Sequence, residues 1–210
     1  MTQLAIIGGI WVSLLYSATV MPATIWVIQI TVSRGWASGL AALTGLACGQ
    51  VPWALATSLL LFQNPKFWQH ADPFIRGGMV IFLVWFAWRC SRAPRVNALR
   101  LVVEGSEWAI LKTSAWKSMV MPWRFFIWAG IIVAISIHLR GPGWMAAGYF
   151  AFGAFVGMMG WLLQFVVLAG LFGKSVPEDI TLHSMNKLRL LATIVPAGLV
   201  LVILAPMIIE

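Results

Sequence analysis

The 210-residue chain has few charged side chains and very few acidic ones. Asp and Glu together number 6, against 14 Lys and Arg, and these four types make up 10% of the residues. Hydrophobic types make up 61%, and the mean hydropathy is +0.91. A soluble domain of this size could not remove so much apolar surface from water. The composition therefore excludes an ordinary soluble fold and predicts an all-α integral membrane protein.

Cysteine and catalytic clusters are also scarce. Cys48 lies in an apolar run and Cys90 at a basic helix end, so we infer neither a disulfide nor a redox motif. His70, His138 and Asp72 fall in predicted outward loops without metal-ligand spacing, and we predict no metal site. The predicted spans contain no nucleophile–base pair or phosphate-binding loop, so we expect no cofactor and no enzymatic activity.

The net charge of +8 would suggest a nucleic-acid partner in a soluble protein. Here the basic residues concentrate in loops on one side of the predicted spans, where the membrane topology explains them. We therefore expect the lipid bilayer, rather than nucleic acid, to be the partner of this charge.

Long apolar runs predict six transmembrane helices. Each run approaches or exceeds the roughly 20 residues needed to cross about 30 Å of hydrocarbon. The first run has no basic residues before it and is too long for the core of a signal peptide, so it is predicted to be a retained span. The spans are expected at Leu4–Val32, Ala37–Phe62, Pro73–Trp88, Lys117–Ile137, Trp144–Phe172 and Leu188–Ile209, with a loop at Gly173–Lys187 before the last.

The chain is interpreted as a single membrane domain in three parts, with half one at 1–92, a connector at 93–113 and half two at 114–210. Four residues near the end of the connector share one helical face, which is typical of a helix lying in the membrane interface. They are Trp108, Leu111, Ala115 and Trp116.

The distribution of basic residues predicts the orientation. The loops after the first, third and fifth spans hold ten basic residues, whereas the opposite side holds three. Because cytoplasmic loops carry the excess of Lys and Arg, both termini are predicted to be periplasmic in a bacterial inner membrane.

Two sequence features recur in the second half. A proline interrupts the first and fourth spans in the same tripeptide, Val-Met-Pro, and should bend or break each helix. The repeated pattern Gly-x3-Gly-x3-Trp favours close helix packing in the second and fifth spans. Either feature alone suits ordinary membrane packing, but together they predict two inverted three-helix halves in which Pro22 superposes on Pro122 and Gly49 on Gly157. The repeated residues are Val20-Met21-Pro22, Val120-Met121-Pro122, Gly45-x3-Gly49-x3-Trp53 and Gly153-x3-Gly157-x3-Trp161.

Three motifs follow the proline-broken first span: Ser33-Arg34-Gly35-x3-Gly39-Leu40, Gly49-x3-Trp53 and Trp85-Phe86-Ala87-Trp88-Arg89-Cys90-Ser91-Arg92-Ala93-Pro94. In this order they resemble the lysine exporter / homoserine–threonine efflux family of small bacterial amino-acid exporters, over nearly the whole chain. The resemblance implies a carrier that exports an amino acid or a similar small metabolite from the cytoplasm.

The chain departs from the family at its signature positions. Met21-Pro22-Ala23 replaces Pro-Gly-Pro, Met121-Pro122-Trp123 replaces Asn-Pro-Lys, and Gln50 and Met158 replace two aspartates. Large apolar residues at these positions predict a dry, tightly packed centre, with Trp123 filling the substrate's place. The alternative function is therefore a non-transporting homologue that serves as a subunit of a larger membrane complex. A homo-oligomer is compatible with either function.

The candidate substrate-binding residues lie near the two prolines or are neutral polar groups in apolar runs. Arg124 could hold a substrate carboxylate, but its predicted depth of about 10 Å in the fourth span favours snorkelling to the cytoplasmic headgroups. The glutamines suit either a polar path or hydrogen bonds between helices. The candidates are Pro22, Gln29, Gln50, Pro122, Arg124 and Gln164.

Overall fold

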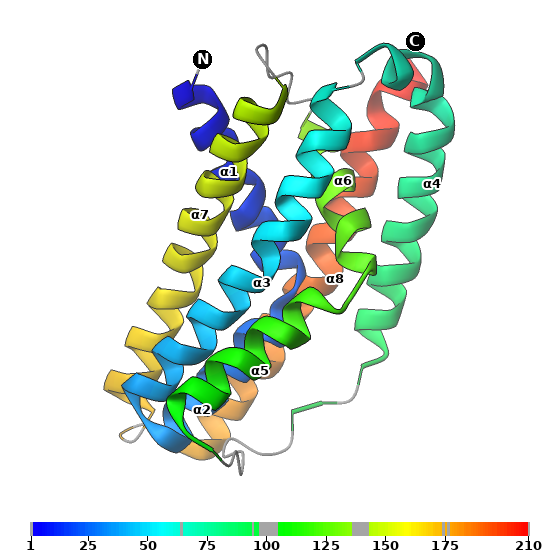
Figure 1. The fold of residues 1–210 in the computed structure, drawn as a ribbon. Coiled ribbons are helices and arrows are strands. Elements are labelled where there is room, and N and C mark those ends of the chain that lie inside the picture. The colour runs from blue at the N-terminus through cyan, green and yellow to red at the C-terminus, as the bar shows by residue number, and fades with distance from the viewer. Residues whose placement is uncertain are drawn as a thin grey trace.

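The computed structural model describes residues 2–63, 65–93, 95–96, 105–135, 143–173, 175 and 177–209. Every regular element within these ranges is an α-helix, which confirms the all-helical prediction (Figure 1). The helices are α1 (Thr2–Thr19), α2 (Met21–Arg34), α3 (Trp36–Gln63), α4 (Pro65–Ser91), α5 (Glu107–Met119), α6 (Trp123–Ile135), α7 (Gly143–Phe172) and α8 (Glu178–Ile209).

Three of the described helices are long and apolar enough to cross a membrane, namely α3, α7 and α8. Two bent pairs, α1 with α2 and α5 with α6, bring the number of candidate spans to five if each pair forms one span. The helix α4 has 27 residues but is not among them. The helices are thus those of a membrane protein, with three to five candidate spans.

Both bends coincide with the repeated tripeptide. The axes of α1 and α2 differ by 78°, and those of α5 and α6 by 67°. Pro22 and Pro122 each lack a backbone N–H, and the proline ring clashes with the preceding turn, so neither helix continues through. These bends confirm the predicted breaks. Proline alone does not dictate one, because Pro52 lies inside the continuous helix α3.

Glycines allow two pairs of helices to pack closely. Helix α5 runs along α3, and α1 runs along α7 (Figure 1). A Cβ atom added at Gly45 or Gly49 would collide with backbone oxygens of α5. One added at Gly153 or Gly157 would come too close to atoms of α1. Both copies of Gly-x3-Gly are therefore places where helices touch with almost no side chain between them.

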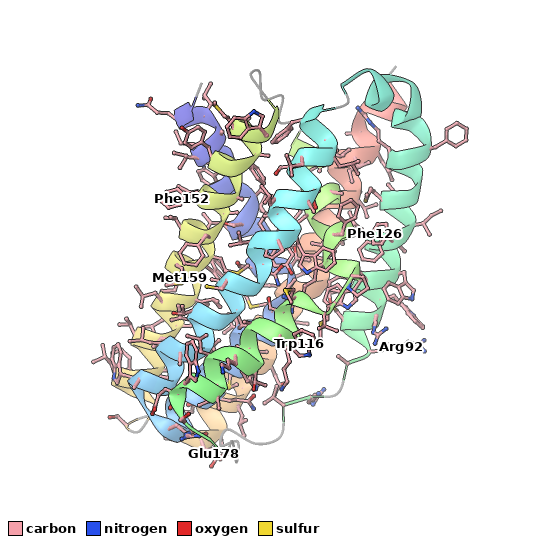
Figure 2. The ribbon with its side chains drawn as sticks, viewed as in Figure 1. Arg92, Trp116, Phe126, Phe152, Met159 and Glu178 are labelled. Atoms are coloured by element: carbon pink, nitrogen blue, oxygen red, sulfur yellow. The ribbon has the colours of Figure 1, made fainter. Side chains whose placement is uncertain are left out.

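The two chain ends lie at the opposite end of the bundle from Arg92 and Glu178 (Figure 1, Figure 2). Helix α1 starts and α8 finishes at the same end (Figure 1), whereas Arg92 and Glu178 lie at the other (Figure 2). Near Arg92, cationic groups stack on tryptophan rings, as is typical of membrane-interface anchors. The pairs, with distances to the ring centroid, are Arg89–Trp85 at 5.4 Å, Arg92–Trp88 at 4.7 Å, Lys112–Trp108 at 5.0 Å and Lys117–Trp26 at 5.3 Å.

Helix α5 begins at Glu107. The fourth span was predicted to start near Lys117, ten residues later. Gly105 has φ +106°, and the Ser106 hydroxyl caps the helix by accepting a hydrogen bond from the Ala109 N–H at 3.4 Å. The helix that carries the predicted interfacial face is therefore part of the bent pair and packs along α3, while Trp108 and Trp116 of that face are each 62% exposed. The predicted boundary between residues 113 and 114 falls inside α5.

Helix α8 also begins earlier than predicted. The expected loop Gly173–Lys187 becomes helical at Glu178. Pro177 precedes the helix, and Glu178 and Asp179 occupy its first turn, where carboxylates interact favourably with the helix dipole. By contrast, α3 and α7 match the predicted second and fifth spans to within one residue at each end.

Candidate functional site

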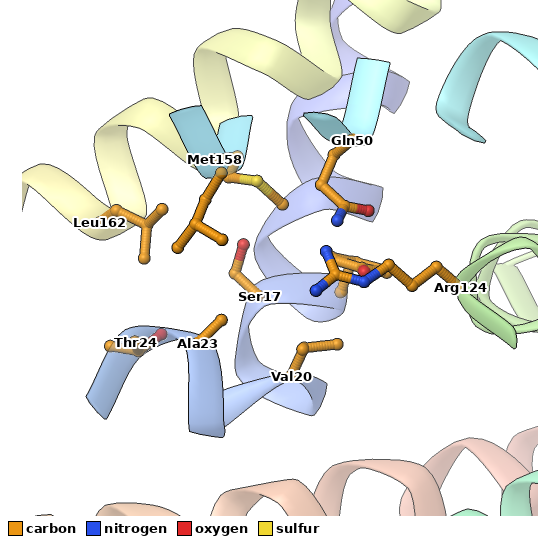
Figure 3. Close-up of a pocket in the computed structure, with 10 residues that line it drawn as sticks. Ser17, Val20, Ala23, Thr24, Gln50, Arg124, Met158 and Leu162 are labelled. Carbon is orange, nitrogen blue, oxygen red and sulfur yellow. The ribbon is translucent and has the colours of Figure 1, made fainter. Parts of the chain in front are cut away.

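The bundle contains a small cavity next to the first bend. It has a volume of about 20 Å³, which is enough for a single water-sized particle. Its lining comes from α1, α2, α3, α6 and α7 (Figure 3). The lining residues are Tyr16, Ser17, Val20, Ala23, Thr24, Leu46, Gln50, Arg124, Met158 and Leu162.

Arg124 carries the only charge in this lining. It is the second residue of α6, immediately after the second bend, and only 5% of its surface is exposed. Its Nη1 donates a hydrogen bond to the Ser118 hydroxyl oxygen at 2.7 Å, and Nη2 donates to the Met121 sulfur at 3.7 Å. Its guanidinium points toward Ser17 and Gln50 (Figure 3). The prediction that Arg124 snorkels to the headgroups is therefore wrong.

The misplaced start of the fourth span explains this error. Counted from Lys117, Arg124 is seven residues into the span, within reach of the headgroups. Counted from Glu107, where α5 begins, it is seventeen residues along the bent pair. The candidate span formed by this bent pair ends at Ala134, so Arg124 lies well inside the span.

Ser118 joins the two halves of this polar cluster. Its oxygen accepts hydrogen bonds from Arg124 and from the Gln50 side-chain amide, and its hydroxyl donates to the Leu46 carbonyl oxygen at 2.9 Å. A hydroxyl offers two lone pairs and one proton, so Ser118 is fully used. The Gln50 oxygen accepts from the Trp128 indole N–H at 3.3 Å. The cluster thus ties α3 to both sides of the second bend.

Three buried polar atoms at the cavity have no hydrogen-bond partner within the described part of the chain. They are the Tyr16 hydroxyl, the Ser17 hydroxyl and Nε of Arg124. The Tyr16 ring stacks on Trp128 with centroids 4.7 Å apart, which fixes its position. Unpaired polar groups are costly in an apolar interior, and a site that retains three of them is organised to meet a polar ligand.

The tryptophans of the repeated pattern reach the bends. The Trp53 indole N–H donates to the carbonyl oxygen of Met119, the last residue of α5, at 3.0 Å. The Trp161 indole N–H donates to the Thr24 hydroxyl oxygen at 3.4 Å, just after the first bend. A broken helix leaves carbonyl groups without their usual partners, and the Trp53 indole replaces one of these partners at the second bend.

Only two of the six predicted site residues line the cavity, Gln50 and Arg124. Pro22 and Pro122 form the bends, but their side chains are exposed, and Gln164 is exposed on α7. Gln29 is buried on α2 outside the cavity lining. Sequence reasoning missed Tyr16, Ser17 and Ser118. The one available signal was their position, four to six residues before the two prolines.

The predicted filling of the centre by Trp123 is wrong, whereas the predicted tight packing stays a prediction, since the cavity is only about 20 Å³. Gln50 and Arg124 line a cavity at the first bend, and Trp123 is not part of its lining. Instead the Trp123 ring lies beside Phe86, with centroids 5.5 Å apart. Met158 does narrow the cavity, as its size suggested.

Comparison of the chain with protein-family models, curated proteins and solved structures finds no match. The function must therefore be argued from the site itself.

The site favours binding over bond-making chemistry. It combines a guanidinium, a primary amide and three hydroxyl groups with aliphatic side chains, and such groups recognise anionic or polar solutes. The described residues contain no group of three or more His, Cys, Asp or Glu that could hold a metal ion. The weak metal candidates His70, Asp72 and His138 have side chains outside the described part of the structure.

Proposed function

We propose that this chain is a bacterial inner-membrane carrier that exports an amino acid or a similar small metabolite, with the solute bound at the Arg124–Gln50 cavity. The observation that carries the proposal is a buried guanidinium at the second bend, facing a cavity that the first bend also lines. Charged groups inside a membrane are costly and usually mark a solute pathway. Broken helices at mid-membrane are where many carriers bind their substrates.

The electrostatics favour a solute with a carboxylate. The acidic side chains that the structure describes are Glu107, Glu178 and Asp179, and all three are exposed. Arg124 therefore has no buried carboxylate among the described residues to balance its charge. A carboxylate is the planar anion that a guanidinium binds best, through parallel N–H donors. The family resemblance, with its amino-acid substrates, is consistent with this preference.

We further propose that the chain crosses the membrane six times, as two inverted halves, with α4 and both bent pairs as spans. Support comes from the two glycine crossings, because α3 meets α5 as α7 meets α1. Gly49 faces Ala115 and Gly157 faces Ile10, so these contacts are related between the halves.

The prolines do not follow the same correspondence. Pro22 lies twelve residues after Ile10, whereas Pro122 lies seven residues after Ala115. A superposition that matches the glycines leaves the prolines five residues apart, about 7.5 Å along a helix. The halves we propose are therefore related at the glycines, and one bend has moved by more than a turn.

The orientation we propose places both termini in the periplasm. The ten-to-three distribution of basic residues supports it, as do the cation–tryptophan stacks near Arg92. The common location of the two chain ends agrees with an even number of crossings (Figure 1).

One observation favours the alternative, a non-transporting subunit of a membrane complex. The cavity of about 20 Å³ is far below the roughly 300 Å³ of typical small-molecule sites. A carrier must therefore widen this cavity when it opens to either side, whereas a subunit can keep it closed.

Efflux from preloaded proteoliposomes separates the two functions. We expect export of at least one member of a panel of radiolabelled amino acids. The efflux rate should fall by about 30-fold or more in Arg124→Gln, because removing one partner of a buried charged contact typically costs 2–5 kcal/mol. Arg92→Gln is the matched control, because Arg92 is exposed. Absence of efflux across the panel, or equal efflux by Arg124→Gln, would contradict the carrier proposal.

A further inference from the structure

The cavity beside Arg124 is lined by polar atoms that have no hydrogen-bond partner among the described residues. Arg124 Nε carries an N–H that can only donate, and the Tyr16 and Ser17 hydroxyls can donate as well. Tyr16 and Ser17 are both more than nine-tenths buried, as is Arg124. Ser118 already accepts twice, and the Gln50 oxygen accepts from Trp128. The Tyr16 and Ser17 hydroxyls can also accept, but Arg124 Nε and the positive charge of the guanidinium can be satisfied only by a group that accepts hydrogen bonds.

The charge balance points in the same direction. A buried cation without a counter-ion is strongly unfavourable in an apolar interior, and no described carboxylate is buried near Arg124. The Met121 sulfur is only a weak acceptor, and Ser118 is neutral. A ligand that accepts hydrogen bonds and carries one negative charge would satisfy the donors and balance the guanidinium together.

The volume restricts which anion fits. About 20 Å³ admits one small particle, and a single-atom halide needs less room than any polyatomic carboxylate. Acetate or the carboxylate end of a metabolite needs more room than a cavity of this volume provides. Figure 3 shows the Arg124 guanidinium and the Ser17 side chain directed into this space, with Met158 and Leu162 closing one side.

We propose that the cavity binds a chloride-sized monovalent anion, which acts as the counter-ion of Arg124 while the cavity has the volume seen here. This proposal does not depend on transport, because a non-transporting subunit would need the same counter-ion. In a carrier, the solute's carboxylate would replace the halide when the cavity widens.

The first test compares anions at constant ionic strength. The purified full-length chain in detergent is unfolded by heating in sodium chloride, bromide, acetate or gluconate. Chloride and bromide should raise the midpoint Tm by about 3 °C over gluconate and show saturation, as expected for ligands that bind only the folded state. Equal Tm values in chloride and gluconate would overturn the proposal. A larger shift with acetate than with chloride would also overturn it, in favour of a carboxylate site.

Variants assign the effect to the cavity. Arg124→Gln should lose the chloride-dependent shift, whereas Arg92→Gln, which changes an exposed arginine, should keep it. Ser17→Ala should raise the chloride concentration needed for half the shift by about fivefold, the effect of one hydrogen bond. An undiminished shift in Arg124→Gln would contradict the proposal. If Arg124→Gln does not fold, an unchanged half-maximal concentration in Ser17→Ala would contradict it instead.

Bromide provides the direct observation. Crystals grown in bromide should give an anomalous peak within hydrogen-bonding distance of Arg124 Nε, and the peak should disappear when gluconate replaces bromide. Density for water alone at this position, without an anomalous signal, would overturn the proposal whatever the transport assays give.

Discussion

Val20-Met21-Pro22 and Val120-Met121-Pro122 are identical tripeptides at two bends, yet their side chains lie in different surroundings. At the first bend, Val20 is 6% exposed and Met21 is fully buried. At the second, Val120 is 53% exposed and Met121 is 37% exposed. Val20 and Met21 therefore face the interior of the bundle, whereas Val120 and Met121 are exposed, and both prolines are exposed.

The positions of the bends relative to the glycine crossings explain this difference. At the second bend, Pro122 lies seven residues after the crossing at Ala115. At the first bend, Pro22 lies twelve residues after the crossing at Ile10, a difference of five residues. Five residues turn an α-helix by about 500°, a net rotation of about 140°, which carries the tripeptide to nearly the opposite face. Interior positions at the second bend are taken by Ser118 and Arg124 instead. One bend therefore supplies packing and the other supplies charge.

The comparison is tested most strongly at the crossings themselves. Gly49→Val and Gly157→Val should each destabilise the protein by about 2–3 kcal/mol, because the added atoms would collide with neighbouring backbone. Gly148→Val on α7 is the control, since a Cβ there has nothing within 4 Å. Urea or thermal unfolding in detergent measures the difference. If only one of the two substitutions destabilises the protein more than the control does, the two crossings are not equivalent. The positions of the bends could then not be compared relative to the crossings.

The tripeptides themselves should respond unequally. Met21→Ala removes a fully buried side chain and should cost about 2 kcal/mol of unfolding free energy, mainly through lost packing contacts. Met121→Ala changes a partly exposed side chain and should cost about 0.5 kcal/mol. Unfolding of both variants in the same detergent measures the two losses of unfolding free energy. Equal losses would show that the two tripeptides pack alike, against the rotation argument.

Sequence patterns predicted α3 and α7 well because uncharged runs define both helices. Helix α7 lies in a long uncharged run, and the absence of charge sets both its ends. The start of α5 was missed although Gly105-Ser106-Glu107 carries a helix-capping signal, because the flanking charges resembled a loop. The depth of Arg124 was then misjudged by the same ten residues.

The cavity could not be predicted from the sequence, for a geometric reason. Tyr16, Ser17 and Ser118 are ordinary polar residues in apolar runs, and a hydrogen bond between neighbouring helices would account for each of them equally well. Tyr16, Ser17 and Ser118 come together through the packing of helices that are distant in the sequence. Local sequence patterns do not encode such packing. Gln50 was found because it stands where the resembled family has an aspartate, and Arg124 because it is a charged residue within a predicted span.

The central claim is that the cavity between the bends opens as a solute site. It is tested by thiol accessibility of Ser17→Cys in a background with Cys48→Ser and Cys90→Ser, using a small anionic methanethiosulfonate reagent on oriented membrane vesicles. Val12→Cys on α1 is the control, since Val12 is fully buried and outside the cavity lining. A carrier predicts that Ser17→Cys reacts at least about tenfold faster than the control, because transient opening exposes it. Equal, negligible labelling of both positions from either side of the membrane would contradict the account.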